Sequence, residues 1–213
     1  MSVRPIIRFP DPALKRQCLP VEAFDEDLRA LSDDLYDTMR AAPGVGITAA
    51  HVGVALRLVV LDLVEIGGRR TYANPEILWS STETMEHTEG SVSMPGATET
   101  VTRPRAVDIR YRDLDGIVHE ERLEGFPAIC MQHEIDQLDG IFWLQRLSKL
   151  KRANAKRLRG RIEIVGDHRM IAGNVIEVAL MGKLSGRYYV ETSRHRIERG
   201  AGYTTEIEVR RVA

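Results

Sequence analysis

Apolar residues in the first part of the chain recur every three or four positions between residues 25 and 41. This spacing is typical of an amphipathic helix. Asp25 stands at an N-cap position, acidic residues follow it, and the glycines of the stretch PGVG come after the last apolar position. The pattern therefore predicts a helix over residues 25–41. Its apolar positions are Leu28, Leu31, Leu35 and Met39.

Other stretches show strand periodicity or turn chemistry. Residues 56–64, LRLVVLDLV, are apolar and rich in β-branched side chains, which predicts a buried strand. Two alternating runs flank the Asp-Gly pair at 115–116 and predict a β-hairpin. The Asn-Pro pair at 74–75 predicts a turn. Residues 82–104 are polar and interrupted by glycine and proline, so they predict loop with short strands.

A second helical pattern lies at residues 126–138, and apolar positions cover most of it. We therefore predict a largely buried helix. Residues four apart project from the same face, so His133 and Gln137 are expected side by side. Cys130 is interpreted as a small buried apolar residue. The apolar positions are Phe126, Ile129, Cys130, Ile135 and Leu138.

The sequence changes character after about residue 164. Runs that favour β-structure are separated by glycines, and two alternating runs, 188–198 and 203–212, predict a hairpin. The basic segment 147–163 ahead of them is interpreted as an exposed helix. Together the patterns predict an α+β protein, with a domain of residues 1–164 and a β-rich extension of residues 165–213 whose role is unknown.

Composition limits the classes of partner. The 213 residues carry 30 basic and 31 acidic side chains, a balance that predicts neither nucleic acid nor an anionic membrane as a partner. No apolar run approaches the ~20 residues of a membrane span, and the first residues lack the apolar core of a signal peptide. Two cysteines, Cys18 and Cys130, predict no disulfide framework. We therefore expect a cytoplasmic protein with reduced thiols.

Candidate chemistry lies on the second predicted helix, in the stretch MQHEIDQLDG at 131–140. Metallohydrolases of the H-E-x-x-H type hold a metal with two histidines one turn apart and use the glutamate on a metal-bound water. Here His133 and Glu134 are present, and Gln137 stands where the second histidine belongs. Taken alone, a His-Glu pair on a helix is more often a surface or capping feature than a metal site.

Three stretches, in order, resemble the signature motifs of the peptide deformylase family. GVGITAAHVG at 44–53 is similar to the family's G-x-G-x-A-A-x-Q-x-G, EGSVSMPG at 89–96 to its E-G-C-L-S-x-P, and QHEIDQLDG at 132–140 to its Q-H-E-x-D-H-L-x-G. The resemblance runs over about residues 5–160. It implies antiparallel strands around a central helix that bears the last motif. It also implies metal-dependent removal of the formyl group from N-terminal formyl-methionine peptides.

In that family a cysteine thiolate and two histidines hold a divalent metal, a glutamate moves protons, and a glutamine with a backbone N–H steadies the oxyanion. Carried over by position, the first histidine is His133 and the glutamate is Glu134. Ser91 stands in place of the cysteine, Gln137 in place of the second histidine, and His51 in place of the glutamine. The sequence therefore departs from the family where the metal is held.

These replacements weaken the expected metal site. The Ser91 hydroxyl is neutral at pH 7, and Gln137 offers an amide oxygen, which suits hard ions better than iron or zinc. The loss of two ligands should cost more than the ~10–100-fold caused by changes around the ligands. We expect no metal at high occupancy, and any ion present to be iron, zinc or nickel. Without metal, Glu134 would act on a poor nucleophile, so deformylase activity should be lost or strongly reduced.

The same residues allow two other catalytic arrangements. An active amidase could hold metal in a rebuilt site of His51, His133 and Glu134. The simpler interpretation is that His51 hydrogen-bonds Glu134 or Gln137 within a buried polar pocket. Ser91 could act as a nucleophile only with a base within ~3 Å. No G-x-S-x-G elbow surrounds it, so this use is disfavoured.

A third use is a non-catalytic module that binds N-blocked peptides. Two glycine-containing stretches could accept an extended peptide as an added strand. A homodimer is compatible with the sequence. Arg103 either pairs with Glu89, which would hold the Ser91 loop, or is exposed. The candidate peptide-binding residues are Gly44, Val45, Gly46, Gly90, Ser91 and Val92.

Overall fold

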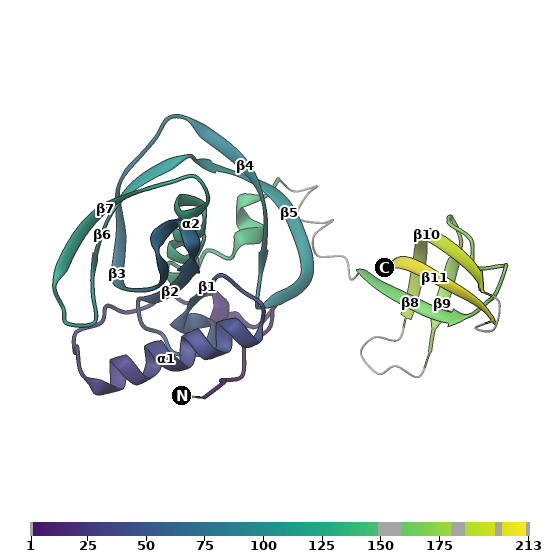
Figure 1. Cartoon of the computed structure of the whole chain (residues 1–213), viewed down its shortest axis with the longest axis horizontal. Coiled ribbons are helices and arrows are strands. Elements are labelled where there is room, and N and C mark those ends of the chain that lie inside the picture. Colours follow the sequence, from purple (N-terminus) through teal and green to yellow (C-terminus); the bar gives the residue numbers. More distant parts are fainter. Residues whose placement is uncertain (1, 149–158, 180–185, 199–201, 212–213) are drawn as a thin grey trace. The chain divides into compact units, whose positions relative to one another are not determined.

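The computed structural model describes residues 2–148, 159–179, 186–198 and 202–211. The chain forms two compact units, Met1–Ser148 and Lys149–Ala213 (Figure 1). The first unit combines helices with antiparallel strands, which confirms the predicted α+β class. Among the described residues, no helix is both long and apolar enough to cross a membrane.

A five-stranded antiparallel sheet organises the first unit, in the order β1-β2-β3-β6-β7. The predicted buried strand is β2, and the predicted hairpin is β6–β7, with Gly116 in the turn at a φ of 79°. The strands are β1 (Gly46–Thr48), β2 (Leu58–Leu63), β3 (Gly68–Ser80), β6 (Ala106–Arg112) and β7 (Val118–Glu124). Short 3-10 helices connect the elements: η1 (Pro12–Lys15), η2 (Ala49–Val52), η3 (Val64–Ile66) and η4 (Trp143–Arg146).

Helix α1 (Glu26–Ala41) confirms the helix predicted over residues 25–41. It begins after the expected N-cap, where the Asp25 carboxylate accepts the N–H of Leu28 at 3.1 Å. Its four apolar positions are buried against a cluster that includes Ile47 and Leu58 of the sheet. Burial of each leucine contributes about 1.5–3 kcal/mol, so this face attaches the helix to the sheet.

Helix α2 (Phe126–Leu138) has the predicted bounds and is buried on almost every side. Figure 1 shows it in the middle of the first unit, among the strands. Proline at its first turn is well tolerated, because the N–H that it lacks would have no helical partner. The polar residues of α2 are buried with it, so only other groups of the unit or a bound ligand can supply their hydrogen-bond partners. These residues are Gln132, Glu134, Asp136 and Gln137.

Two long strands, β4 (Thr84–Ser91) and β5 (Met94–Pro104), replace the loop with short strands predicted for residues 82–104. They pair with each other as a two-stranded antiparallel sheet. Its glycines and the proline at 95 lie near the end of the hairpin, where the register shifts at Gly90 and Ser91. The other residues of the two strands are rich in threonine, which favours strands. Their pairing with each other stabilises the extended structure.

The predicted turn at residues 74–75 is an irregularity inside β3. Asn74 has a φ of 54°, and the pairing with β6 shifts register between Ala73 and Glu76. The Asn74 amide makes two hydrogen bonds to the backbone of Val21, at 2.7 and 2.8 Å. These bonds to a distant part of the sequence stabilise the left-handed backbone of Asn74. The chain therefore continues along β3 and does not turn back.

The second unit contains a four-stranded antiparallel sheet in the order β8-β11-β10-β9. The predicted C-terminal hairpin is confirmed as β10 and β11. Apolar side chains of these two strands form the core of the sheet: Tyr188, Val190, Ile207 and Val209. The strands are β8 (Arg159–Val165), β9 (Val175–Val178), β10 (Gly186–Glu198) and β11 (Gly202–Arg211).

The boundary predicted near residue 164 falls inside β8, which pairs with β11. The two units instead divide between Ser148 and Lys149. Ile162 packs against the core of the second unit, so the alternation ahead of residue 164 already belongs to that sheet. For the predicted basic helix, residues 149–158 lie outside the described residues, and residues 159–163 form a strand.

Candidate functional site

A cleft of about 580 Å³ lies beside helix α2 in the first unit. Five parts of the chain line it: the N-terminal segment at Arg8, the glycine-rich stretch that leads into β1, η2 at His51, the end of the β4–β5 hairpin, and one face of α2. The predicted site residues found in this lining are Gly44, Val45, Gly46, His51, Gly90, Ser91, Val92, His133 and Glu134. Gln137 is not part of the lining.

Two glycines allow the walls of the cleft to approach each other. A Cβ on Gly46 would lie 2.5 Å from Oε1 of Glu134, and a Cβ on Gly44 would lie 2.9 Å from Cγ1 of Val92. Both contacts are too short for a side chain without displacement. Glycine at position 46 therefore lets the Glu134 carboxylate lie directly against the backbone of β1.

His133 is oriented by a carboxylate on the opposite wall. Its Nδ1 lies 2.9 Å from Oε2 of Glu89, and its side chain is 11% exposed. Because a carboxylate accepts, Nδ1 carries a proton and Nε2 holds the free lone pair of the neutral ring. Burial alone would lower the pKa of His133, but the hydrogen bond to Glu89 and the charge of Glu134 raise it above the ordinary value.

Glu134 is buried, and its Oε2 has no hydrogen-bond partner among the described residues. Burial raises the pKa of Glu134 to about 7, and the charge of Glu89 acts in the same direction. The charges of His133 and Arg103 oppose this shift but do not cancel it. Close to neutral pH, the carboxyl group is therefore divided between its protonated and ionised forms.

The raised pKa predicts that Glu134 makes folding pH-dependent. The folded protein holds this proton more tightly than the unfolded chain, whose ordinary glutamate pKa is 4.5. The resulting stability is fully present below about pH 4.5 and is lost as the pH rises through about 7. We expect Glu134→Gln to unfold like the native protein at about pH 4.5, and to be more stable by up to about 3 kcal/mol at about pH 8.

Urea unfolding at the two pH values checks this expectation. The matched control is Glu83→Gln, since Glu83 has a side chain that is 67% exposed. The control should leave the pH dependence unchanged. A stability difference between Glu134→Gln and the native protein that is the same at both pH values would contradict the expectation.

His51 is buried and directs one ring nitrogen to its own helical turn. Its Nδ1 accepts the backbone N–H of Thr48 at 3.0 Å and lies 2.9 Å from the Thr48 hydroxyl. Nε2 therefore carries the proton of the neutral ring. Burial, and then the charge of His133, lower the pKa of His51 to about 3, so the ring stays neutral. Buried Nε2 has no partner among the residues that the structure describes.

The predicted hydrogen bond from His51 to Glu134 or Gln137 was wrong. The reason is local, because Thr48 is the N-cap of η2 and His51, three residues later, accepts the backbone N–H of that residue with its ring. Gln137 is also engaged elsewhere, since its Nε2 donates to the Leu14 carbonyl at 2.8 Å. Both side chains are fixed by backbone groups rather than by each other.

Ser91 lines the cleft, and its hydroxyl accepts the N–H of Ser93 at 3.2 Å. Within the described residues, no hydrogen bond joins Ser91 to His133. Nor does any group of three or more histidine, cysteine, aspartate or glutamate side chains in the described part of the chain converge to hold a metal ion. Cys130 also lines the cleft; it is buried as predicted, and burial raises the pKa of its thiol.

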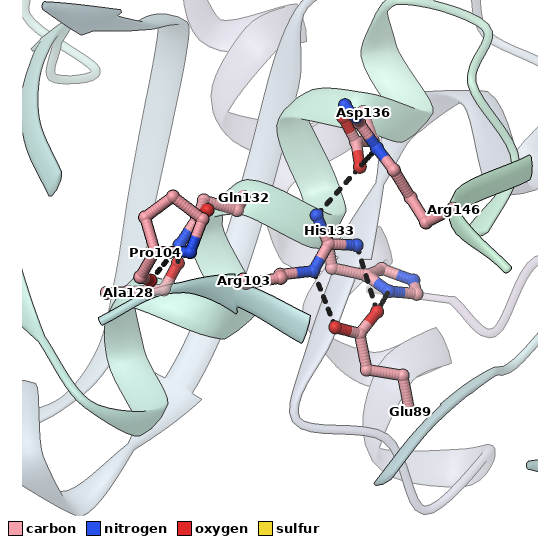
Figure 2. Close-up of polar contacts among 8 residues, drawn as sticks. All are labelled: Glu89, Arg103, Pro104, Ala128, Gln132, His133, Asp136 and Arg146. Carbon is pink, nitrogen blue, oxygen red and sulfur yellow. Dashed lines mark hydrogen bonds and ion pairs between the residues drawn. The ribbon is translucent and has the colours of Figure 1, made fainter. Parts of the chain in front are cut away.

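A network of buried ion pairs holds Glu89, the hydrogen-bond partner of His133, in place (Figure 2). Arg103 bonds Glu89 through Nε to Oε1 at 2.5 Å and through Nη2 to Oε2 at 2.9 Å. Its Nη1 bonds Asp136 Oδ2 at 2.8 Å, and Arg146 reaches the same carboxylate at 2.9 Å. Burial alone would raise the pKa of Glu89, but the hydrogen bonds and charges of His133 and Arg103 outweigh it and hold that pKa at about 2.

The predicted pairing of Arg103 with Glu89 is confirmed. Sequence reasoning missed three other residues of the site, two in the ion network and one in the cleft lining. Asp136 and Arg146 complete the network, and Arg8 lines the cleft from the N-terminal segment. Asp136 carried a signal, because an acidic residue in a helix predicted to be buried needs a partner. Arg146 and Arg8 carried none, since both reach the site through chain folding.

The first unit is similar to proteins of known family. A family model described as Polypeptide deformylase matches residues 3–153. A protein named "Peptide deformylase-like" from Rhizobium meliloti (strain 1021) is 57% identical over 155 residues, which are 73% of this chain and 90% of that protein. A "Peptide deformylase" from Phenylobacterium zucineum (strain HLK1) is 45% identical over 158 residues, covering 73% and 94%.

Solved structures show the same similarity. A peptide deformylase from Legionella pneumophila has a TM-score of 0.69 at 42% identity, covering 73% of this chain and 92% of that chain. A peptide deformylase from Ehrlichia chaffeensis, in complex with actinonin, has a TM-score of 0.69 at 37% identity, covering 73% and 94%. The family match ends at residue 153, so nearly all of the second unit lies beyond it.

Proposed function

Because this chain belongs to the polypeptide deformylase family, we propose that its cleft binds N-terminally blocked peptides while metal-dependent deformylation is lost or strongly reduced. The family reaction is removal of the formyl group from formyl-methionine peptides. The proposal keeps the family's ligand class and removes its metal-dependent step. It rests on the unpaired polar atoms that line the cleft and on the replacement of metal ligands by Ser91 and Gln137.

The family uses a divalent metal, and the residues at the three ligand positions do not fit one. His133 offers a nitrogen, but Ser91 offers a neutral hydroxyl in place of a thiolate. Gln137 uses its amide on the Leu14 carbonyl and does not line the cleft. These residues therefore do not supply the ligand set that a transition metal needs.

The rebuilt metal site through His51 is not supported by its hydrogen bonds. A histidine binds metal through an unprotonated nitrogen. The nitrogen of His51 without a proton, Nδ1, is occupied by the backbone N–H of Thr48. Nε2, the other nitrogen, holds the proton. Metal binding at Nε2 would require moving the proton onto Nδ1. The proton would then face the backbone N–H of Thr48, so two donors would point at each other.

The observation that carries the proposal is a pair of buried polar atoms without partners in one cleft. Nε2–H of His51 is a donor, and Oε2 of ionised Glu134 is an acceptor. Unpaired buried groups cost about 1–3 kcal/mol each, so a ligand that pairs them gains affinity. An N-acyl amide offers the complement, because its carbonyl accepts and its N–H donates. The blocked end of a peptide is such a group, whereas a free ammonium terminus has no carbonyl to offer.

Calorimetry with formyl-Met and acetyl-Met peptides, and with the same peptides bearing a free amine, tests the proposal. We expect the blocked peptides to bind and the free-amine peptides to bind far more weakly. His51→Ala should weaken binding of the blocked peptides by ~5- to 150-fold, because it removes the donor. His51→Gln, which keeps an N–H donor, should lose less.

The matched control is His119→Ala, a histidine of the β6–β7 hairpin outside the cleft lining. It should leave affinity unchanged. Absence of heat with every blocked peptide would refute the proposed ligand class. Rapid deformylation by freshly purified protein, prepared without chelator and carrying about one metal ion per chain, would refute the proposed loss of activity.

A further inference from the structure

Arg8 reaches the cleft from the N-terminal segment, which crosses between the two turns that carry the site. The N–H of Ile7 donates to the carbonyl of His51 at 2.8 Å, and the N–H of Phe9 donates to the carbonyl of Ser93 at 2.9 Å. Arg8 stands between these bonds, and its Nη1 donates to the carbonyl of Val92. The guanidinium is therefore held at the cleft by backbone on both sides.

The charge of Arg8 is not balanced by a carboxylate of the described residues. No carboxylate in the described residues forms an ion pair with its guanidinium, although its neighbour in the chain, Arg4, pairs with Asp34 at 2.9 Å. Two glutamates also line the cleft: Glu89 is paired with Arg103 and His133, and within the described residues neither Glu89 nor Glu134 forms an ion pair with Arg8. An uncompensated cation in a cleft attracts anions and repels cations.

The guanidinium also has unused donors. Arginine presents five N–H groups in a planar fork, and the fork matches a carboxylate with two parallel hydrogen bonds. Only one donor, on Nη1, is used by a described residue, the Val92 carbonyl. The side chain is exposed, so the remaining N–H groups are available to a ligand.

From these observations we infer that Arg8 sets the specificity of the cleft, favouring blocked peptides that carry a carboxylate side chain at their second or third residue. The inference rests on the proposed function. Ile7, the residue before Arg8, bonds the backbone carbonyl of His51, and the side chains of Arg8 and His51 both line the cleft, where the imidazole would bind the blocked end. A carboxylate within reach of the guanidinium must therefore lie near that end.

Paired peptides test the inference on the full-length protein. Formyl-Met-Glu-Ala amide is compared with formyl-Met-Gln-Ala amide, and formyl-Met-Ala-Glu amide with formyl-Met-Ala-Gln amide, by calorimetry at low salt. In at least one pair the glutamate peptide should bind ~3- to 10-fold more tightly, as expected for a partly exposed charge pair. The advantage should shrink as salt is added.

Arg8→Gln should weaken binding of the glutamate peptide more than binding of the glutamine peptide, so that the difference within that pair disappears. Arg8→Glu should reverse the preference, so that a lysine peptide binds better than a glutamate peptide. Arg16→Gln is the matched control, since Arg16 is an exposed arginine outside the cleft lining. Thermal unfolding of each variant confirms that it is folded.

The outcomes separate this inference from the proposed function. If both members of each pair bind the native protein equally, Arg8 does not select anions and the inference fails, while the proposed function stands. If Arg8→Gln weakens both members equally, Arg8 only holds the N-terminal segment, and the inference fails again. If no formyl peptide binds, the proposed function fails and takes the inference with it.

Discussion

Replacing Arg103 with methionine is expected to lower the free energy of unfolding of the first unit by about 3–5 kcal/mol. Arg103 is 4% exposed and is the common partner of Glu89 and Asp136, which are also buried. Methionine fills a similar volume but leaves both carboxylates without their shared cation. A buried charge that has lost its partner is far more costly than the pair is favourable, because its hydration was given up on folding.

The measurement is urea unfolding followed by tryptophan fluorescence. The sequence has two tryptophans, Trp79 and Trp143, and both lie in the first unit, so the signal reports on that unit. Arg105→Met is the matched control. Arg105 pairs with Glu83 at 2.9 Å, but the side chains are 58% and 67% exposed, so its loss should cost less than about 1 kcal/mol.

Two results would bear directly on the network. Adding Glu89→Gln to Arg103→Met should recover part of the lost stability, because it removes one of the two buried carboxylates that Arg103 neutralises. If Arg103→Met falls within about 1 kcal/mol of the Arg105→Met control, the network is not what holds Glu89 and His133 in place. The cleft would then need another source of rigidity.

Restoring the family's ligands is expected to restore metal binding. The variant combines Ser91→Cys with Gln137→His, and adds His51→Gln for the oxyanion position. Residues 133 and 137 lie four apart on α2, so a histidine at 137 can share a face with His133 once the bond to Leu14 is lost. A thiolate and two imidazoles form the donor set that binds zinc or iron.

Metal content after purification without chelator should rise from well below stoichiometric to about one ion per chain. Deformylation of formyl-Met peptides should rise by at least ~100-fold, since a bound metal lowers the pKa of its water towards about 7. The single variant Gln137→His, which lacks the thiolate, is the control and should hold little metal. A triple variant that binds no metal would show that positions 91, 133 and 137 do not converge as the resemblance to the family's motifs implies.

Much of the fold could be predicted because its signals are local. Helices α1 and α2, strand β2 and both hairpins follow from periodicity and turn residues within one segment. The β4–β5 hairpin could not be predicted in the same way. Its glycines and proline suggested a loop. Only the pairing of β4 with β5, the next strand along the chain, shows which residues are extended.

The sequence by itself determined which chemical groups are available. It places a histidine and a glutamate on one buried helix, a serine and a glutamine where stronger ligands belong, and His51 shortly after a glycine-rich stretch. Tertiary structure decided the partners of the helix residues: the Leu14 carbonyl accepts the Gln137 amide N–H, and Glu89 orients the His133 ring. The physical reason is that a buried polar side chain takes whichever partner folding brings within about 3 Å, and most such partners are distant in sequence.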